Sequence, residues 1–236
     1  MVSPIVVALD FPSLAEASSM ARMVKAHVGA FKVGLELLWA EGPGVIPTIA
    51  GLGLPVFVDA KLHDIPNTVN RAARELGVRG ARWVTVHATG GSAMIEAAVA
   101  GIDAGSSEAG ILAVTVLTSI DEATMATVGI QGPVNRRVAS LSALAASVGA
   151  EGVVCSVAEV PFVKSAAREL LAVTPGIRAT GSAPDDQARV ATPEAAMAAG
   201  ADLLVIGRPI TRSPDPEAAA AAIAEELAPG RSPPTQ

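Results

Sequence analysis

The stretch Phe57–Thr68, FVDAKLHDIPNT, decides how the rest of the chain is interpreted. It opens as a strand, because the run 56–58, Val-Phe-Val, favours an extended backbone. Side chains alternate between the two faces of a strand, so Phe57, Asp59 and Lys61 are predicted to share one face. A carboxylate and an ammonium group therefore enter the same space at the end of this strand.

A helix is expected directly after this strand. Asp64 stands two residues before Pro66, a favourable first residue of a helix, and apolar residues follow at helical spacing as far as Leu76. Gly77 is predicted to end the helix. Charges at such a junction are costly to bury unless they are paired or used. From this stretch alone, both a solvated loop with a salt bridge and a functional site remain open.

Composition and charge limit the classes of protein. The 236 residues are 50% hydrophobic and 17% charged, which suits one domain with a large core or two small domains. A net charge of −6, a pI of about 5.1 and an aromatic content of 3% argue against a nucleic-acid-binding surface.

Targeting features are not expected. No apolar run reaches the roughly 18 residues that a membrane span needs, and residues 1–4 do not begin a basic and then apolar secretory signal. The single cysteine, Cys155, excludes an internal disulfide and fits a reducing compartment. The chain is therefore expected to act in the cytoplasm, without a membrane or nucleic-acid partner.

Strand-like and helix-like segments alternate along the chain. Strands are predicted at 5–9, 30–33, from Val56, and at 83–87, 111–117, 152–155, 171–174 and 203–206. Helices are predicted at 14–28, at 35–50 with a break at 42–44, and at 66–76. An Ala-rich helix is predicted after residues 89–91, ending at about residue 104, and further helices at 136–148, 157–168, 193–199 and 216–227.

Eight strand–helix units in one chain predict an α/β fold. The strands are continuous Val/Ile/Leu runs, which is typical of a parallel sheet buried on both faces. Their number and the chain length match a closed (β/α)₈ barrel, the TIM barrel. The first strand is not followed by a Gly-x-Gly-x-x-Gly motif, so the main reason to prefer a dinucleotide-binding fold is missing. We therefore predict a single catalytic domain over 1–228, followed by a loose Pro-rich tail at 229–236.

Polar residues stand at or just after the carboxyl ends of the predicted strands. In a barrel these ends converge on one mouth, where active sites lie. Taken singly, each has a simpler interpretation, such as a helix cap for Asp10, and we interpret His63 and His87 as structural. The residues placed at the mouth are Asp10, Lys32, Asp59, Lys61, His87, Thr118, Arg178 and Arg208.

The turn Gly207-Arg208 favours a phosphorylated ligand. It follows the eighth predicted strand, and barrels commonly bind phosphate with the loops after strands seven and eight. Backbone N–H groups at a glycine approach an anion closely, and the arginine fork adds two parallel donors.

Five segments together resemble the orotidine 5′-phosphate decarboxylase family of bacterial type. They are 7–10 VALD, 32–36 KVGLE, 59–68 DAKLHDIPNT, 174–178 TPGIR and 205–211 VIGRPIT, and they occur in the family's order over nearly the whole chain. The Asp-x-Lys-x-x-Asp pattern is shared with relatives that act on other sugar phosphates, whereas its combination with a lysine in the second strand is specific.

The resemblance implies a carbon–carbon lyase that needs no cofactor and no metal. Orotidine 5′-monophosphate would lose CO₂ and become uridine 5′-monophosphate, the last step of de novo pyrimidine biosynthesis. Lys61 would stabilise the carbanion and protonate C6, while Asp59 would face the departing carboxylate. Lys32 and Asp64 would complete a row of alternating charges.

The resemblance also implies a homodimer and a set of binding residues. Asp64, Ile65 and Thr68 match residues that reach the site from a second subunit. The loop 179–186 would close over the ligand, although its sequence departs from the family's. The remaining binding roles are Asp10 and Lys32 at the ribose, Thr118 at the pyrimidine, and Arg178, Gln187, Gly207 and Arg208 at the phosphate.

Two other functions compete with this one. A hexulose-phosphate synthase or ketogulonate-phosphate decarboxylase of the same lineage would use a divalent metal and an acidic residue where Lys32 stands. A catalytically silent barrel would bind the nucleotide without converting it.

Overall fold

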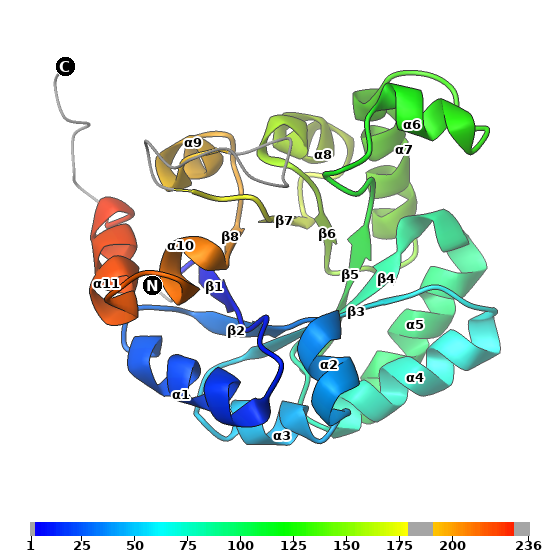
Figure 1. Cartoon of the computed structure of the whole chain (residues 1–236). Helices are drawn as coiled ribbons and strands as arrows, with labels where there is room; N and C mark the ends of the chain where they lie inside the picture. Colours follow the sequence, from blue (N-terminus) through cyan, green and yellow to red (C-terminus); the bar gives the residue numbers. More distant parts are fainter. Residues whose placement is uncertain (1–2, 179–190, 229–236) are drawn as a thin grey trace, which may run out of the picture.

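The structure is a computed structural model that describes residues 3–178 and 191–228. Eight parallel strands form a closed barrel in sequence order, and the helices surround it (Figure 1). This confirms the predicted TIM barrel. The strands are β1 Ile5–Ala8, β2 Ala30–Val33, β3 Val56–Leu62, β4 Trp83–His87, β5 Gly110–Val114, β6 Gly152–Val154, β7 Leu171–Thr174 and β8 Leu203–Ile206.

The helices follow the predicted order, with short additions. Two single turns of 3₁₀ helix, Ala88–Gly90 and Val157–Glu159, precede α5 and α8. The α-helices are α1 Leu14–Val24, α2 Leu35–Glu41, α3 Val45–Ala50, α4 Pro66–Val78, α5 Ser92–Gly105, α6 Glu122–Thr127, α7 Val134–Ser147, α8 Val160–Ala166, α9 Pro193–Ala198, α10 Arg208–Thr211 and α11 Pro216–Glu226.

The predicted end of α4 was wrong. Gly77 lies inside the helix, where an added Cβ would come within 3.2 Å of Ile102 Cδ1 on α5. This glycine therefore allows two helices to pack closely, and Gly80, with a φ of +93°, follows the end of the helix. The polar connection before α7 also contains α6, which Asp121 caps by accepting a hydrogen bond from the Thr124 N–H.

The strands are buried on both faces, which explains their unbroken apolar character. In β1, Ile5 and Val7 pack in the layer between the strands and the helices. Val6 and Ala8 point the other way and fill the barrel interior together with Phe57 and other large side chains. Phe57 is 1% exposed and closes the interior beneath the mouth. The charged residues that follow it in β3 are therefore supported by a packed floor.

The amino-terminal end of the barrel carries an ion pair of its own. The Glu151 carboxylate accepts two hydrogen bonds from the Arg82 guanidinium, at 2.7 and 2.5 Å, and a third from Trp83 Nε1 at 3.1 Å. An added Cβ at Gly110 would lie 1.8 Å from Glu151 Oε2, so a side chain at the start of β5 would displace the Glu151 carboxylate. We call Arg82, Trp83 and Glu151 the basal clamp.

Among the helices of the described residues, none combines the length and apolar character needed to cross a membrane.

Candidate active site

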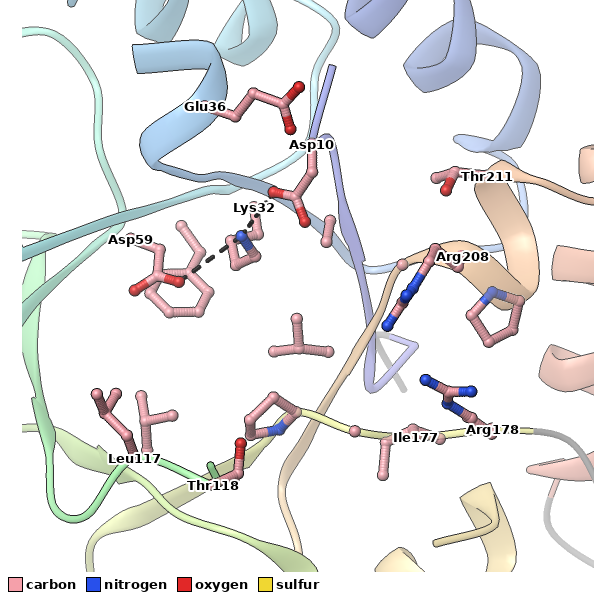
Figure 2. Close-up of a pocket in the computed structure, with 18 of the residues that line it drawn as sticks. Asp10, Lys32, Glu36, Asp59, Leu117, Thr118, Ile177, Arg178, Arg208 and Thr211 are labelled. Atoms are coloured by element: carbon pink, nitrogen blue, oxygen red, sulfur yellow. Dashed lines mark hydrogen bonds and ion pairs between the residues drawn. The ribbon is translucent and has the colours of Figure 1, made fainter. Parts of the chain in front are cut away.

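A cavity of about 680 Å³ opens at the carboxyl ends of the strands. Figure 2 shows charged residues on opposite sides of it. Asp10, Lys32 and Asp59 come from the ends of β1, β2 and β3, while Arg178 and Arg208 follow β7 and β8. The barrel therefore brings together side chains that lie up to 198 positions apart in the sequence.

Four of the lining side chains form a row of alternating charge. Lys32 Nζ lies 3.0 Å from Asp10 Oδ1 and 3.6 Å from Asp59 Oδ2. Lys61 Nζ lies 2.8 Å from the same Asp59 oxygen. We call Asp10, Lys32, Asp59 and Lys61 the charge row; the first three, with their ion pairs, are visible in Figure 2.

Asp59 is held in its ionised form. Burial alone would raise the pKa of this carboxyl, but the positive charges of Lys32 and Lys61, with hydrogen bonds from Lys61 and Thr85, hold its pKa below the usual range. Its side chain is only 15% exposed, so little water screens these interactions. The carboxylate therefore stands as a fixed negative charge between two ammonium groups.

The space for Lys32 depends on a missing side chain. An added Cβ at Gly34 would lie 2.6 Å from Lys32 Nζ and 2.7 Å from Asp10 Oδ1. The backbone of Gly34, with a φ of −95°, is one that any residue adopts. A side chain here would therefore displace the ends of Lys32 and Asp10, while the backbone itself would accept any residue.

The end of β3 departs from regular pairing. Its register against β4 runs from Val58–Val84 to Leu62–Val86, so four residues of β3 advance against two of β4. Within this bulge Lys61 has a φ of +49°, the only positive value at a non-glycine residue in the described chain. Such backbone conformations are costly for residues with a Cβ and often accompany functional sites. Asp59 and Lys61 both line the cavity with Phe57.

The opposite end of the cavity is basic. Arg178 and Arg208 point toward one another (Figure 2), and Gly207 also lines the cavity. The Arg178 N–H donates to the Ala191 carbonyl at 2.9 Å, which fixes the backbone where the loop after β7 begins. Two guanidinium groups facing one space suit a dianion such as phosphate. Thr118 lines the wall between the two charged ends.

Three predicted residues do not reach the cavity of their own chain. Asp64, Ile65 and Thr68 are exposed, and they are absent from the described residues that line the cavity. Asp64 Oδ1 instead accepts the Ile65 N–H at 2.6 Å. Gln187 lies outside the described residues, as do the predicted closing loop 179–186 and the tail 229–236.

The two histidines beside the charge row face each other. The rings of His63 and His87 lie 5.5 Å apart, centroid to centroid. Burial lowers the pKa of His87, and His63 and Lys61 lower it further against an opposing effect of Asp59. Cys155 also lines the cavity, but burial raises the pKa of its thiol, which leaves it a neutral hydrophobe.

Sequence reasoning gave no role to four polar residues of this region, Glu36, Thr85, Thr211 and Arg212. Glu36, from the first turn of α2, lines the cavity. Thr85, in the middle of β4, contacts the charge row from below and is fully buried. Threonine is common in strands, so nothing in the sequence separated Thr85 from an ordinary strand residue.

The fold and the site define an enzyme of the (β/α)₈-barrel class, with a charge row at one end of its cavity and a basic phosphate-type end opposite. The chain belongs to the orotidine 5′-phosphate decarboxylase / HUMPS family, whose model matches residues 3–223.

Curated relatives and solved structures agree with this assignment. The orotidine 5′-phosphate decarboxylase of Anaeromyxobacter sp. strain K is 53% identical over 93% of this chain and 96% of its own length. That of Thermobifida fusca is 51% identical over 96% and 97%. The crystal structure of orotidine 5′-phosphate decarboxylase from Lactobacillus acidophilus superposes with a TM-score of 0.85 at 38% identity, covering 95% of this chain and 99% of that one.

Proposed function

We propose that this chain decarboxylates orotidine 5′-monophosphate to uridine 5′-monophosphate without a cofactor, and that Lys61, Asp59, Lys32 and Asp64 carry out the reaction. The family and the relatives support the activity. The observation that carries the assignment of roles is the Lys61 ammonium held 2.8 Å from a buried, ionised Asp59 at the mouth of the barrel.

The chemistry explains why fixed charges are needed. When the bond between C6 and the carboxylate breaks, the electron pair stays on C6 in the plane of the pyrimidine ring. The π system cannot delocalise that pair, so only nearby positive charge and a proton can stabilise it. Lys61 Nζ supplies both: its charge stabilises the developing carbanion, and its proton passes to C6 as CO₂ departs.

Asp59 and Lys32 prepare Lys61 for this step. Asp59 keeps the Lys61 ammonium charged through an opposite charge at hydrogen-bond distance. Lys32, 3.6 Å away from the same carboxylate, balances the excess negative charge of Asp10 and Asp59. Asp59 would face the departing carboxylate of the substrate. Because these charges are in place before the substrate binds, they need no reorganisation during the reaction.

The rest of the cavity fits the rest of the nucleotide. Asp10 and Lys32 bind the ribose hydroxyls, and Thr118 contacts the pyrimidine. Arg178, Gly207 and Arg208 bind the phosphate at the basic end, to which Gln187 adds a further contact. Binding energy gained at the phosphate then lowers the barrier at the distant C6, because it fixes the ring against the charge row.

The active form is a homodimer in which Asp64, Ile65 and Thr68 complete the site of the partner. Their exposure supports this arrangement, since a buried residue would not reach a neighbour. Ile65 is 66% exposed, and Trp39, on α2, is 84% exposed. Exposed large apolar side chains mark an interaction surface where they form a contiguous patch, and contact with a second chain would cover these two. The single cysteine fits action in the cytoplasm.

The decisive assay follows the absorbance of orotidine 5′-monophosphate in the presence of a chelator and without any added cofactor. We expect full turnover, with uridine 5′-monophosphate as product. Loss of activity on chelation would favour a metal-dependent sugar-phosphate enzyme of the same family. Nucleotide binding without any absorbance change would indicate a silent binding protein.

A further inference from the structure

The hydroxyl group of Thr85 contacts both Asp59 and Lys61 of β3. It lies in the middle of β4 and has no exposed surface. The Lys61 backbone N–H donates to Thr85 Oγ1 at 2.8 Å, and Thr85 Oγ1 lies 2.9 Å from Asp59 Oδ1. Both residues that Thr85 contacts, Asp59 and Lys61, are members of the charge row.

The directions of these hydrogen bonds are fixed by chemistry. A hydroxyl has one hydrogen to donate, and a backbone N–H can only donate. Thr85 therefore accepts from Lys61 and donates its hydrogen to the ionised Asp59. With Oδ1 held by Thr85, the other oxygen, Oδ2, is turned toward Lys61 Nζ at 2.8 Å and Lys32 Nζ at 3.6 Å. The hydroxyl thus sets the rotation of the carboxylate.

The same hydroxyl supports the unusual backbone of Lys61. In the bulge of β3, Lys61 has left the regular pairing with β4 and has a φ of +49°. Its N–H is satisfied by Thr85 Oγ1 in place of a strand carbonyl. A left-handed conformation at a lysine persists only where the surroundings fix it, and this hydrogen bond is one that does so.

We infer that Thr85 is a positioning residue for the decarboxylation, which aligns Asp59 and the Lys61 ammonium through these two hydrogen bonds without touching the substrate. Thr85 is not among the residues that line the cavity, so it acts through its neighbours. The inference rests on the proposed roles of Asp59 and Lys61. Even a small displacement of a reacting group lowers the reaction rate strongly, so hydrogen bonds that hold Asp59 and Lys61 in place affect the rate.

Thr115 provides a matched control one strand further on. It directly follows β5, is 3% exposed, and its hydroxyl donates to the Val154 carbonyl at 3.0 Å. Its replacement by valine also removes a buried hydroxyl from the barrel, but it changes no contact of the charge row. Any general cost of losing a buried hydrogen bond is therefore measured by Thr115→Val.

The test compares kcat, KM and thermal stability of Thr85→Val, Thr85→Ser and Thr115→Val, all assayed well below their melting temperatures. We expect Thr85→Val to lower kcat by about 10- to 100-fold, with a smaller change in the Kd of uridine 5′-monophosphate. Thr85→Ser, which keeps the hydroxyl, should restore most of kcat. Thr115→Val should lose stability but retain kcat.

Two results would overturn the inference. In one, Thr85→Val keeps the kcat of Thr115→Val, which makes Thr85 structural only. In the other, Thr85→Ser is as slow as Thr85→Val. If Thr85→Val does not fold, Thr85→Cys replaces it, since a thiol is a weak donor and acceptor; a wild-type kcat in that variant would also overturn the inference. Lys61→Ala and the chelator assay separate the two proposals, because high activity in Lys61→Ala refutes the role given to Lys61, and no turnover by the wild type refutes the proposed function.

Discussion

Single residues determine the chemistry of this barrel because its cavity places each charge against another. The proposed reaction depends most on Lys61, which supplies both the stabilising charge and the proton. Its ammonium is the only one at hydrogen-bond distance from Asp59 among the described residues, and its backbone is the one strained non-glycine position there.

Lys61→Ala removes both the stabilising charge and the proton donor. We expect kcat to fall by at least about 10³-fold, the loss typical of removing a preorganised charge or a general acid. Binding of uridine 5′-monophosphate should stay measurable by calorimetry, because the phosphate end is untouched. Lys25→Ala, at the exposed end of α1, is the control and should retain full activity. An unchanged kcat in Lys61→Ala would contradict the assigned role.

Gly34→Ala tests whether the charge row tolerates any displacement. The new methyl group would collide with Lys32 Nζ and Asp10 Oδ1, at 2.6 and 2.7 Å. We expect a stability loss of about 1–3 kcal/mol, as for other overpacked sites, together with a higher KM and a lower kcat. Gly44→Ala, where nothing lies within 4 Å of the added Cβ, should behave as wild type in denaturant titrations and in kinetics.

His87 predicts a pH dependence of stability. Because its folded pKa is lowered below 6.5, the unfolded chain binds the proton more readily. The stability contributed by neutral His87 is complete above pH 6.5 and is lost as the pH falls through the folded pKa. We expect the melting temperature of His87→Gln to fall less than that of wild type between pH 7.5 and 5. Equal falls would show that other groups dominate.

Whole strands and helices explain what the sequence could and could not predict. The strands 83–87, 171–174 and 203–206 were predicted with their observed bounds, since both of their faces are buried and each apolar run ends abruptly. Gly77 was misinterpreted because its role, close packing of α4 on α5, depends on a residue 25 positions away. A local sequence pattern does not predict a contact between residues so far apart in the chain.

The site divides in the same way. Charges at strand ends could be placed at one mouth, because closure of the barrel brings all carboxyl ends together. Thr85 could not be found, since its importance comes from the bulge that lifts Lys61 out of the regular pairing. The roles of Asp64, Ile65 and Thr68 came only from the family resemblance and stay predictions.

The basal clamp belongs to the amino-terminal ends of the strands and should affect stability alone. Glu151→Gln weakens the bidentate pair with Arg82 and should cost about 1–2 kcal/mol in chemical denaturation, given hydrogen bonds to charged groups at a site about one-third exposed. The kcat should not change, because the cavity lies at the other end. Glu75→Gln, which breaks the exposed pair with Arg79 on α4, should cost at most about 0.5 kcal/mol. A lowered kcat in Glu151→Gln would contradict this separation.

At the scale of the whole molecule, the proposed homodimer is the property that decides activity. Light scattering should give a mass of twice the 23.6 kDa chain. Lys61→Ala and Asp64→Ala chains should each be inactive alone, because each lacks one part of every site. Random mixing after reversible dissociation should restore activity at about a quarter of the sites, as shared isologous sites require. A monomeric mass, or no recovery on mixing under conditions where subunits exchange, would refute shared sites.

Closure of the barrel has a consequence for how two chains can meet. Since β8 pairs with β1, the sheet offers no free edge to which a neighbour could add a strand. Two chains would then contact each other through side chains of helices and loops, with no contribution from main-chain pairing. In the proposed homodimer, recognition between copies is therefore separable from folding, and we expect substitutions at Ile65 or Trp39 to separate the two chains while each barrel stays folded.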